Sequence, residues 1–155
     1  MTFRRPTEAD HAAVLDRVVE WWPDGRGAEL ASLLPRLFFQ HFAATSMILD
    51  GPDGRISAFL LGFRSADSPE VAYIHFVGVD PALRGQGIAR SLYDAFAADM
   101  ARRGCTILNA VTGPTNTGSQ AFHRAMGFSL ADPVPDYDGP GQARVTMSRP
   151  ISLLP

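Results

Sequence analysis

The sequence predicts an α/β fold in a single domain that spans residues 1–155. Its length suits one domain with a continuous core, and 46% hydrophobic with 19% charged residues is an ordinary globular composition. The decisive pattern is an apolar strand at Val71–Val79, an amphipathic helix from Ile88, and a second apolar strand at 106–111. Two strands joined through a helix are normally parallel neighbours.

Two helices are predicted ahead of this unit. Residues 3–5 can form a short first strand, and helical spacing of apolar residues over 7–22 indicates the first helix, which residues 23–25 stop. A second helix is indicated over 30–42, and Pro35 either interrupts it or starts it.

A hairpin and two further elements complete the prediction. Strands at 46–49 and 55–63 are joined by the turn-rich tetrapeptide Gly51–Gly54, which is typical of a hairpin. After the strand at 106–111, a helix is expected over 119–126 and a final strand over 143–149.

The turn between Val79 and the helix at Ile88 predicts an anion site. Gly85 and Gly87 carry no side chain that could block a ligand, and the first N–H groups of a helix lack intrahelical partners. The helix dipole favours an anion there by about 0.3–1 kcal/mol per exposed charge. A phosphate or pyrophosphate is the natural ligand.

Two common phosphate-binding motifs fit this turn poorly. A Walker loop needs a lysine, and the chain contains none. A dinucleotide fingerprint needs a third glycine, where this chain has Arg90, and an acidic residue after the next strand, which ends in Thr112-Gly113 instead. Dinucleotide binding is therefore the weaker alternative.

Two segments resemble a known family. The run Arg84–Ala89 resembles the Arg/Gln-x-x-Gly-x-Gly/Ala signature of the GNAT superfamily of acyl-CoA N-acyltransferases. The run Asn116–Phe128 resembles that family's Asn-led helix ending in Gly-Phe, and the two segments come in the family's order. The resemblance implies a mixed central sheet of about six to seven strands flanked by about four helices. It also implies acetyl transfer from acetyl-CoA (coenzyme A as the carrier) to a primary amine.

The resemblance assigns a set of cofactor-binding residues. It implies that backbone groups of Val77, Gly78 and Val79 pair with the pantetheine arm or polarise the thioester, and that Asn116 and Ser119 bind that arm. The alternatives are that Gly78 makes room for a bulky neighbour and that Asn116 and Ser119 cap a helix. The phosphates are expected at the remaining cofactor-binding residues, Arg84, Gly85, Gln86, Gly87, Ile88, Ala89 and Arg90.

Two histidines are the candidate catalytic residues, because an amine must lose a proton before it attacks. His123 occupies the place where many members of the resembled family carry a tyrosine that protonates the leaving thiolate; the alternative is a partly exposed helix residue. His75 could act as the general base, and a hydrogen-bonded core histidine is an equal alternative. Cys105 has no adjacent base and is expected to be an inert buried thiol, so direct transfer in a ternary complex is favoured.

The acceptor is the least defined part of the prediction. Trp22, Phe38 and Phe39 lie on the first two helices and are candidate substrate-binding residues, although aromatics at helical spacing more often form core. Tyr137 lies in an acidic segment, 132–141, that is either a lid over a cationic amine or a solvated loop. A polyamine, an amino acid, an antibiotic and a protein terminus all remain open as acceptors.

Composition limits the other functions. A net charge of −2 argues against nucleic acid as a partner, no apolar run is long enough for a membrane span, and residues 1–30 lack a signal-peptide layout. One cysteine excludes an internal disulfide and a thiolate metal cluster, so no metal is expected. Cytoplasmic residence is the simplest interpretation, and homodimers are common in the resembled family. A catalytically inactive acyl-CoA-binding module is the main alternative function.

Overall fold

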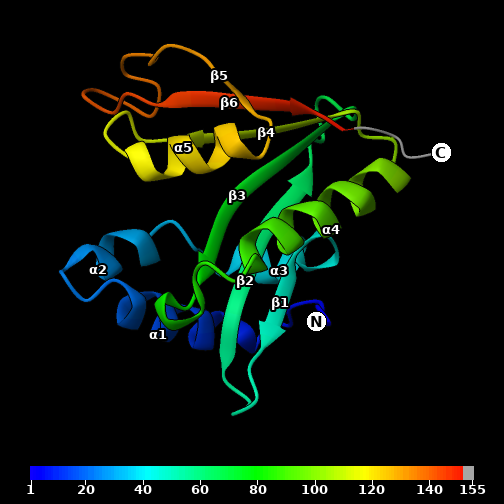
Figure 1. Cartoon of the computed structure of the whole chain (residues 1–155), viewed down its shortest axis with the longest axis vertical. Helices are drawn as coiled ribbons and strands as arrows, with labels where there is room; N and C mark the ends of the chain where they lie inside the picture. Colours follow the sequence, from blue (N-terminus) through cyan, green and yellow to red (C-terminus); the bar gives the residue numbers. More distant parts are fainter. Residues whose placement is uncertain (152–155) are drawn as a thin grey trace. The chain divides into compact units, whose positions relative to one another are not determined.

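The computed structural model describes residues 1–151, which divide into two compact units and contain one six-stranded mixed sheet, as expected for an α/β fold (Figure 1). The strands are β1 (Met47–Asp50), β2 (Ile56–Arg64), β3 (Val71–Val79), β4 (Ile107–Thr112), β5 (Ser129–Leu130) and β6 (Val145–Pro150). The α-helices of the described residues are α1 (Asp10–Trp21), α2 (Arg26–Ala31), α3 (Leu37–His41), α4 (Ile88–Arg102) and α5 (Thr117–Ala125). The strand order is β1-β2-β3-β4-β6-β5.

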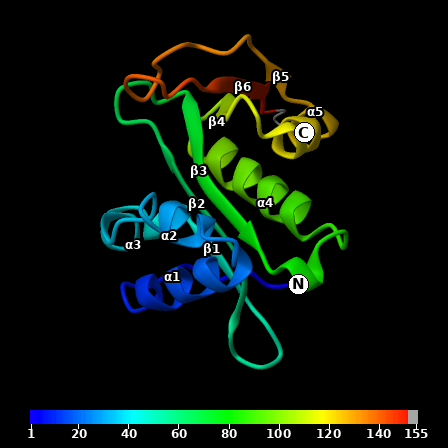
Figure 2. The same cartoon turned by 90° about the vertical axis from the view of Figure 1, so that its left-hand side faces the viewer.

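The first unit contains residues 1–63 and 76–96. Figure 2 shows α1, α2 and α3 on one side of β1 and β2, and the first half of α4 on the other side. The two-sided cover explains why β2 is buried without interruption from Ile56 to Gly62. The core on the α1 side includes Val14, Val18, Trp21, Leu34, Phe38, Phe39, Ile48, Phe59 and Leu61.

Two expectations for the first unit change in detail. The expected helix at 30–42 is two helices, α2 and α3, separated around Pro35, because proline lacks an N–H and restricts the residue before it. The expected strand at 3–5 is a single bridge between Arg4 and Ile48. The hairpin is confirmed, with β1 and β2 antiparallel.

The second unit contains residues 64–75 and the chain from Ala97 on. Here β4 pairs in parallel with β3, as expected, over Val71–Tyr73 and Ile107–Asn109. On its other edge β4 pairs antiparallel with β6, and β6 pairs with β5, a two-residue strand that the sequence did not reveal. Along β4, buried residues alternate with half-buried ones, so one face of the strand is covered and the other is open.

Candidate functional site

The glycine turn of the first unit leads directly into α4. The turn starts at Asp80, which caps the short 3-10 helix η2 (Pro81–Leu83). The Asp80 carboxylate accepts a hydrogen bond from the Ala82 N–H at 2.9 Å. The first bond into α4 runs from the Ser91 N–H to the Gly87 carbonyl at 3.0 Å. The N–H groups of the three residues between them therefore have no intrahelical partner.

Gly85 and Gly87 are required by backbone conformation. Their φ angles are +81° and +78°, a region that other residues enter only with strain. A Cβ added at either position would meet nothing within 4 Å, and the residues from Gly85 to Gly87 are exposed. The turn thus presents accessible backbone at the start of a 15-residue helix, which is the geometry that an anion needs.

Arg17 holds the start of this turn in place. The side chain is only 8% exposed, and its guanidinium donates to the Ile56 carbonyl at 2.9 Å, to Asp80 Oδ2 at 2.9 Å and to Glu20 Oε2 at 2.7 Å. The Asp80 N–H also donates to the Ser57 carbonyl at 2.9 Å. The sequence analysis missed Arg17, and its signal was an arginine placed within the apolar helical stripe of α1.

Trp22 supports the turn through Arg84. The Arg84 guanidinium lies 5.7 Å from the centre of the Trp22 ring, a cation–π arrangement, and Trp22 meets Phe76 edge-on. Trp22 is a candidate acceptor-binding residue, and that assignment stays a prediction; the structure places its ring beside the turn. Arg84 and Arg90 are both exposed.

Other predicted residues of the first unit lie in its core. Phe38 and Phe39 are 9% and 2% exposed and pack in the core cluster, so they belong to the part of the aromatic set that forms core. Gly78 is buried, and a Cβ there would lie 2.6 Å from Phe59 and 3.1 Å from Trp21. The alternative interpretation of Gly78, room for a bulky neighbour, therefore accounts for this glycine. Val77 and Val79 beside it are half-buried.

In the second unit, Asn116 caps α5. Its Oδ1 accepts a hydrogen bond from the Ser119 N–H at 3.1 Å, and the residue is exposed. The capping alternative for Asn116 is thus present in the structure. The capping hydrogen bond uses the side-chain oxygen Oδ1, and the side-chain Nδ2 can still donate a hydrogen bond.

His123 is a buried residue of α5, only 6% exposed, and not a partly exposed one. Its Nδ1 lies 2.7 Å from the Ser119 carbonyl, which can only accept, so Nδ1 carries the proton. Phe122 and Phe128 meet the imidazole edge-on. Burial lowers the pKa of His123, opposed by the bond to Ser119, so the neutral ring is favoured at neutral pH.

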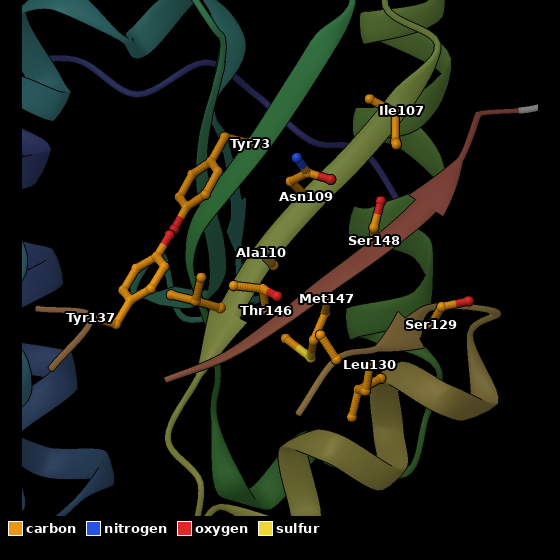
Figure 3. Close-up of a pocket in the computed structure, with 12 residues that line it drawn as sticks. Tyr73, Ile107, Asn109, Ala110, Ser129, Leu130, Tyr137, Thr146, Met147 and Ser148 are labelled. Atoms are coloured by element: carbon orange, nitrogen blue, oxygen red, sulfur yellow. The ribbon is translucent and has the colours of Figure 1, made fainter. Parts of the chain in front are cut away.

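A cavity of about 430 Å³ opens on the half-buried face of the second unit's sheet (Figure 3). Strand alternation places Tyr73 on that face, with His75 two residues on along the same strand and half-buried. Tyr137, a predicted substrate-binding residue, lies in the lining. The lining residues are Tyr73, Ile107, Asn109, Ala110, Val111, Ser129, Leu130, Ala131, Tyr137, Thr146, Met147 and Ser148.

Two polar features of this cavity stand out. Asn109 Oδ1 is buried and has no hydrogen-bond partner among the described residues. Burial, with Tyr137 and Asp138 nearby, raises the pKa of Tyr73 to about 12. Asn109 was missed by the sequence analysis, although a polar residue inside the apolar strand 106–111 was a readable signal.

The acidic segment 132–141 is an ordered loop beside the cavity. Asp136 Oδ1 accepts from the Gly141 N–H at 2.7 Å, and Asp138 pairs with Arg144 at 2.9 Å. An isolated bridge joins Val134 to Arg144. The Asp136 carboxylate is thus occupied within the segment, and the Asp138 carboxylate is occupied by Arg144, which lies just before β6.

Cys105 is fully buried, and burial raises the pKa of its thiol, so the thiolate needed for covalent catalysis is disfavoured. Among residues 1–151 no group of three or more histidine, cysteine, aspartate or glutamate side chains could hold a metal ion. In the same range no helix is both long and apolar enough to cross a bilayer.

Residues 14–128 match the acetyltransferase (GNAT) family. An L-2,4-diaminobutyric acid acetyltransferase of Streptomyces coelicolor is 36% identical over 121 residues, 75% of this chain and 67% of that protein. An aminoglycoside N(6')-acetyltransferase type 1 of Klebsiella aerogenes is 33% identical over 133 residues, 81% of this chain and 88% of that one. A phosphinothricin acetyltransferase of Sinorhizobium meliloti, solved in complex with acetyl-CoA, shares the fold, with a TM-score of 0.72 and 20% identity over 97% of this chain and 88% of that chain.

Proposed function

Because the chain belongs to the acetyltransferase (GNAT) family and transfers an acetyl group from acetyl-CoA to an amine, we propose that its glycine turn binds the pyrophosphate of acetyl-CoA. The observation that carries this proposal is the exposed turn at Gly85 and Gly87, which runs straight into α4. Two left-handed glycines expose the backbone, and the helix start supplies N–H groups for phosphate oxygens. Gln86, Ile88 and Ala89 would contribute backbone groups, and Arg84 and Arg90 would contribute charge.

The experiment is calorimetric titration of the purified protein with acetyl-CoA, with NADH as the control ligand. Gly87→Asp places a carboxylate where the pyrophosphate should bind and should abolish measurable acetyl-CoA binding. Gly104→Asp is the matched control, because Gly104 also has a positive φ, of +93°, and also has open space around it. Equal loss in both variants would assign the effect to backbone strain and contradict the proposed site.

The pantetheine arm is assigned to residues of each unit separately. We propose that backbone groups of Val77 and Val79 pair with it in the first unit, and that an N–H at Gly78 or Val79 polarises the thioester carbonyl. In the second unit, Asn116 and Ser119 would hydrogen-bond the arm. The free Nδ2 donor of the Asn116 amide supports its part.

Proton transfer is assigned to the two histidines. A protonated amine has no lone pair, so we propose that His75 accepts the proton of the attacking amine and that His123 returns one to the departing thiolate. The neutral ring holds its one proton on Nδ1, bonded to Ser119, so only the protonated imidazolium can give a proton to the thiolate. Burial lowers the pKa of His123, so this step should weaken as the pH rises. The amine attacks the thioester carbon directly; the C–N bond forms as the C–S bond breaks, and the buried Cys105 takes no part.

The remaining assignments concern the whole chain. We propose one N-acetyltransferase domain over residues 1–155, because the family match at 14–128 includes residues of both compact units. Use of acetyl-CoA supports a cytoplasmic location, and the net charge of −2 supports a small amine rather than nucleic acid as the partner. A homodimer stays a prediction from the family resemblance.

A further inference from the structure

We propose that the cavity of the second unit binds a hydroxylated, uncharged ring, so that the acceptor is an amine carried on a polyhydroxylated ring of the amino-sugar class. This inference rests on the proposed acetyl transfer to an amine and names the substrate class. Every residue that carries it belongs to the second unit. The inference concerns the ring that carries the acceptor amine, and it does not say where the amine itself lies.

The lining of the cavity is polar but uncharged. Five hydroxyl groups, from Tyr73, Ser129, Tyr137, Thr146 and Ser148, and the amide of Asn109 surround it. None of the described lining residues carries a formal charge, and Asp138, the carboxylate near Tyr73, is paired with Arg144. A free amino acid would need a cation for its carboxylate, and a polyamine would need carboxylates for its ammonium groups. Hydroxyls both donate and accept, so the lining matches a ligand made of hydroxyls.

Asn109 supplies the specific demand for a donor. Its Oδ1 is buried without a partner among the described residues, and an unsatisfied buried acceptor is costly to the folded protein. Ser148 lies directly opposite Asn109 in the antiparallel pair of β4 and β6, so both side chains lie on the same face of the sheet and line the same part of the cavity. A ligand hydroxyl there would satisfy the Asn109 oxygen.

The two tyrosines add an aromatic wall. Figure 3 shows the hydroxyls of Tyr73 and Tyr137 pointing toward one another across the cavity. Tyr137 is 45% exposed, and Ile107 and Leu130 supply apolar surface nearby. A sugar-like ring offers C–H faces for such surfaces and hydroxyl edges for the polar groups. About 430 Å³ is also within the usual range of roughly 300–1,000 Å³ for small-molecule sites.

The test compares amines that differ in one property. The amine 6-amino-6-deoxy-D-glucose carries hydroxyls on its ring, and cyclohexanemethylamine is a similar primary amine without them. Lysine adds a carboxylate and spermidine adds further ammonium groups. Thiol release from acetyl-CoA gives kcat/KM for each, and we expect at least a tenfold preference for the hydroxylated amine over the other three.

Two variants locate the preference. Asn109→Leu removes the unpartnered oxygen and keeps the branching of the side chain, and Tyr137→Phe removes one hydroxyl from an exposed side chain. Each should lower kcat/KM for the hydroxylated amine about twofold to tenfold, the value of one hydrogen bond, and should not lower kcat/KM for cyclohexanemethylamine. Preference for lysine or spermidine, or an unchanged preference in both variants, would overturn the inference. Titration with acetyl-CoA distinguishes failure of this inference from failure of the proposed function. If acetyl-CoA binds normally, only the acceptor class is wrong; if it does not bind, the proposed function and the acceptor class are both overturned.

Discussion

At the residue scale, His123 couples stability to pH. Its folded-state pKa is lowered by burial, so below the unfolded value of about 6.5 the unfolded chain binds the proton more readily. The stabilisation is therefore complete above that pH and is lost as the pH falls toward the folded pKa, by at most about 1.4 kcal/mol per pH unit. We expect urea unfolding between pH 7.5 and 5.5 to show this loss.

His123→Phe should remove that pH dependence, because a phenyl ring suits the pocket between Phe122 and Phe128 and does not titrate. His41→Phe is the control, since His41 is exposed and should leave the dependence in place. An unchanged slope in His123→Phe would mean that another group is responsible.

Asn116 separates capping from cofactor binding. Asn116→Asp keeps a carboxylate oxygen for the Ser119 N–H but removes the Nδ2 donor, so the melting temperature should stay close to that of the parent protein. Acetyl-CoA affinity should fall about twofold to tenfold, the value of one hydrogen bond. Asn116→Ala should also lose about 0.5–2 kcal/mol of stability with its cap. Unchanged affinity in Asn116→Asp would restrict this residue to capping.

At the element scale, Arg17 connects α1 to the start of the glycine turn. Arg17→Lys keeps the charge but cannot reach the Ile56 carbonyl, Glu20 and Asp80 together. We expect a loss of about 2 kcal/mol in the free energy of unfolding, less than for a fully buried pair because Asp80 is partly exposed. Below the melting temperature the KM for acetyl-CoA should rise several-fold with kcat within about twofold of the parent.

Arg55→Met is the matched control for Arg17. Arg55 binds the same Glu20 carboxylate at 2.8 Å but is exposed, and among the contacts described above it is Arg17 and not Arg55 that binds Asp80. Its KM for acetyl-CoA should not move. A rise in both variants would trace the effect to Glu20 rather than to the turn.

Elements with a strong local pattern could be predicted from the sequence. The bounds of β3, Val71–Val79, and the start of α4 at Ile88 match, because alternation and the glycine turn mark them. The two-residue strand β5 is too short for any periodicity. A polar residue in an apolar pattern marks Arg17 and Asn109 as unusual, but the local pattern does not show what they contact. The partners of Arg17, the place of Asn109 in the cavity and the packing of Gly78 against Phe59 depend on residues far apart in the sequence. Tyr137 was found because it stood in an unusual acidic segment.

At the scale of the whole molecule, two compact units carry different parts of the proposed chemistry. The first contains the phosphate turn with its supporting Arg17, and the second contains α5, His123 and the hydroxyl-lined cavity. The proposed donor and acceptor recognition therefore rest on different sets of side chains. Variants of Gly87 should act on acetyl-CoA alone, and variants of Asn109 on the amine alone.

The division into units has a consequence for dissecting the protein. The chain passes from one unit to the other at 63/64, 75/76 and 96/97, and these points lie inside β2, β3 and α4. Each unit is thus assembled from separate stretches of chain, with no linker between them that a gene truncation could use. Neither half can be expressed as one continuous fragment, and donor and acceptor recognition must be separated by point substitution in the intact polypeptide.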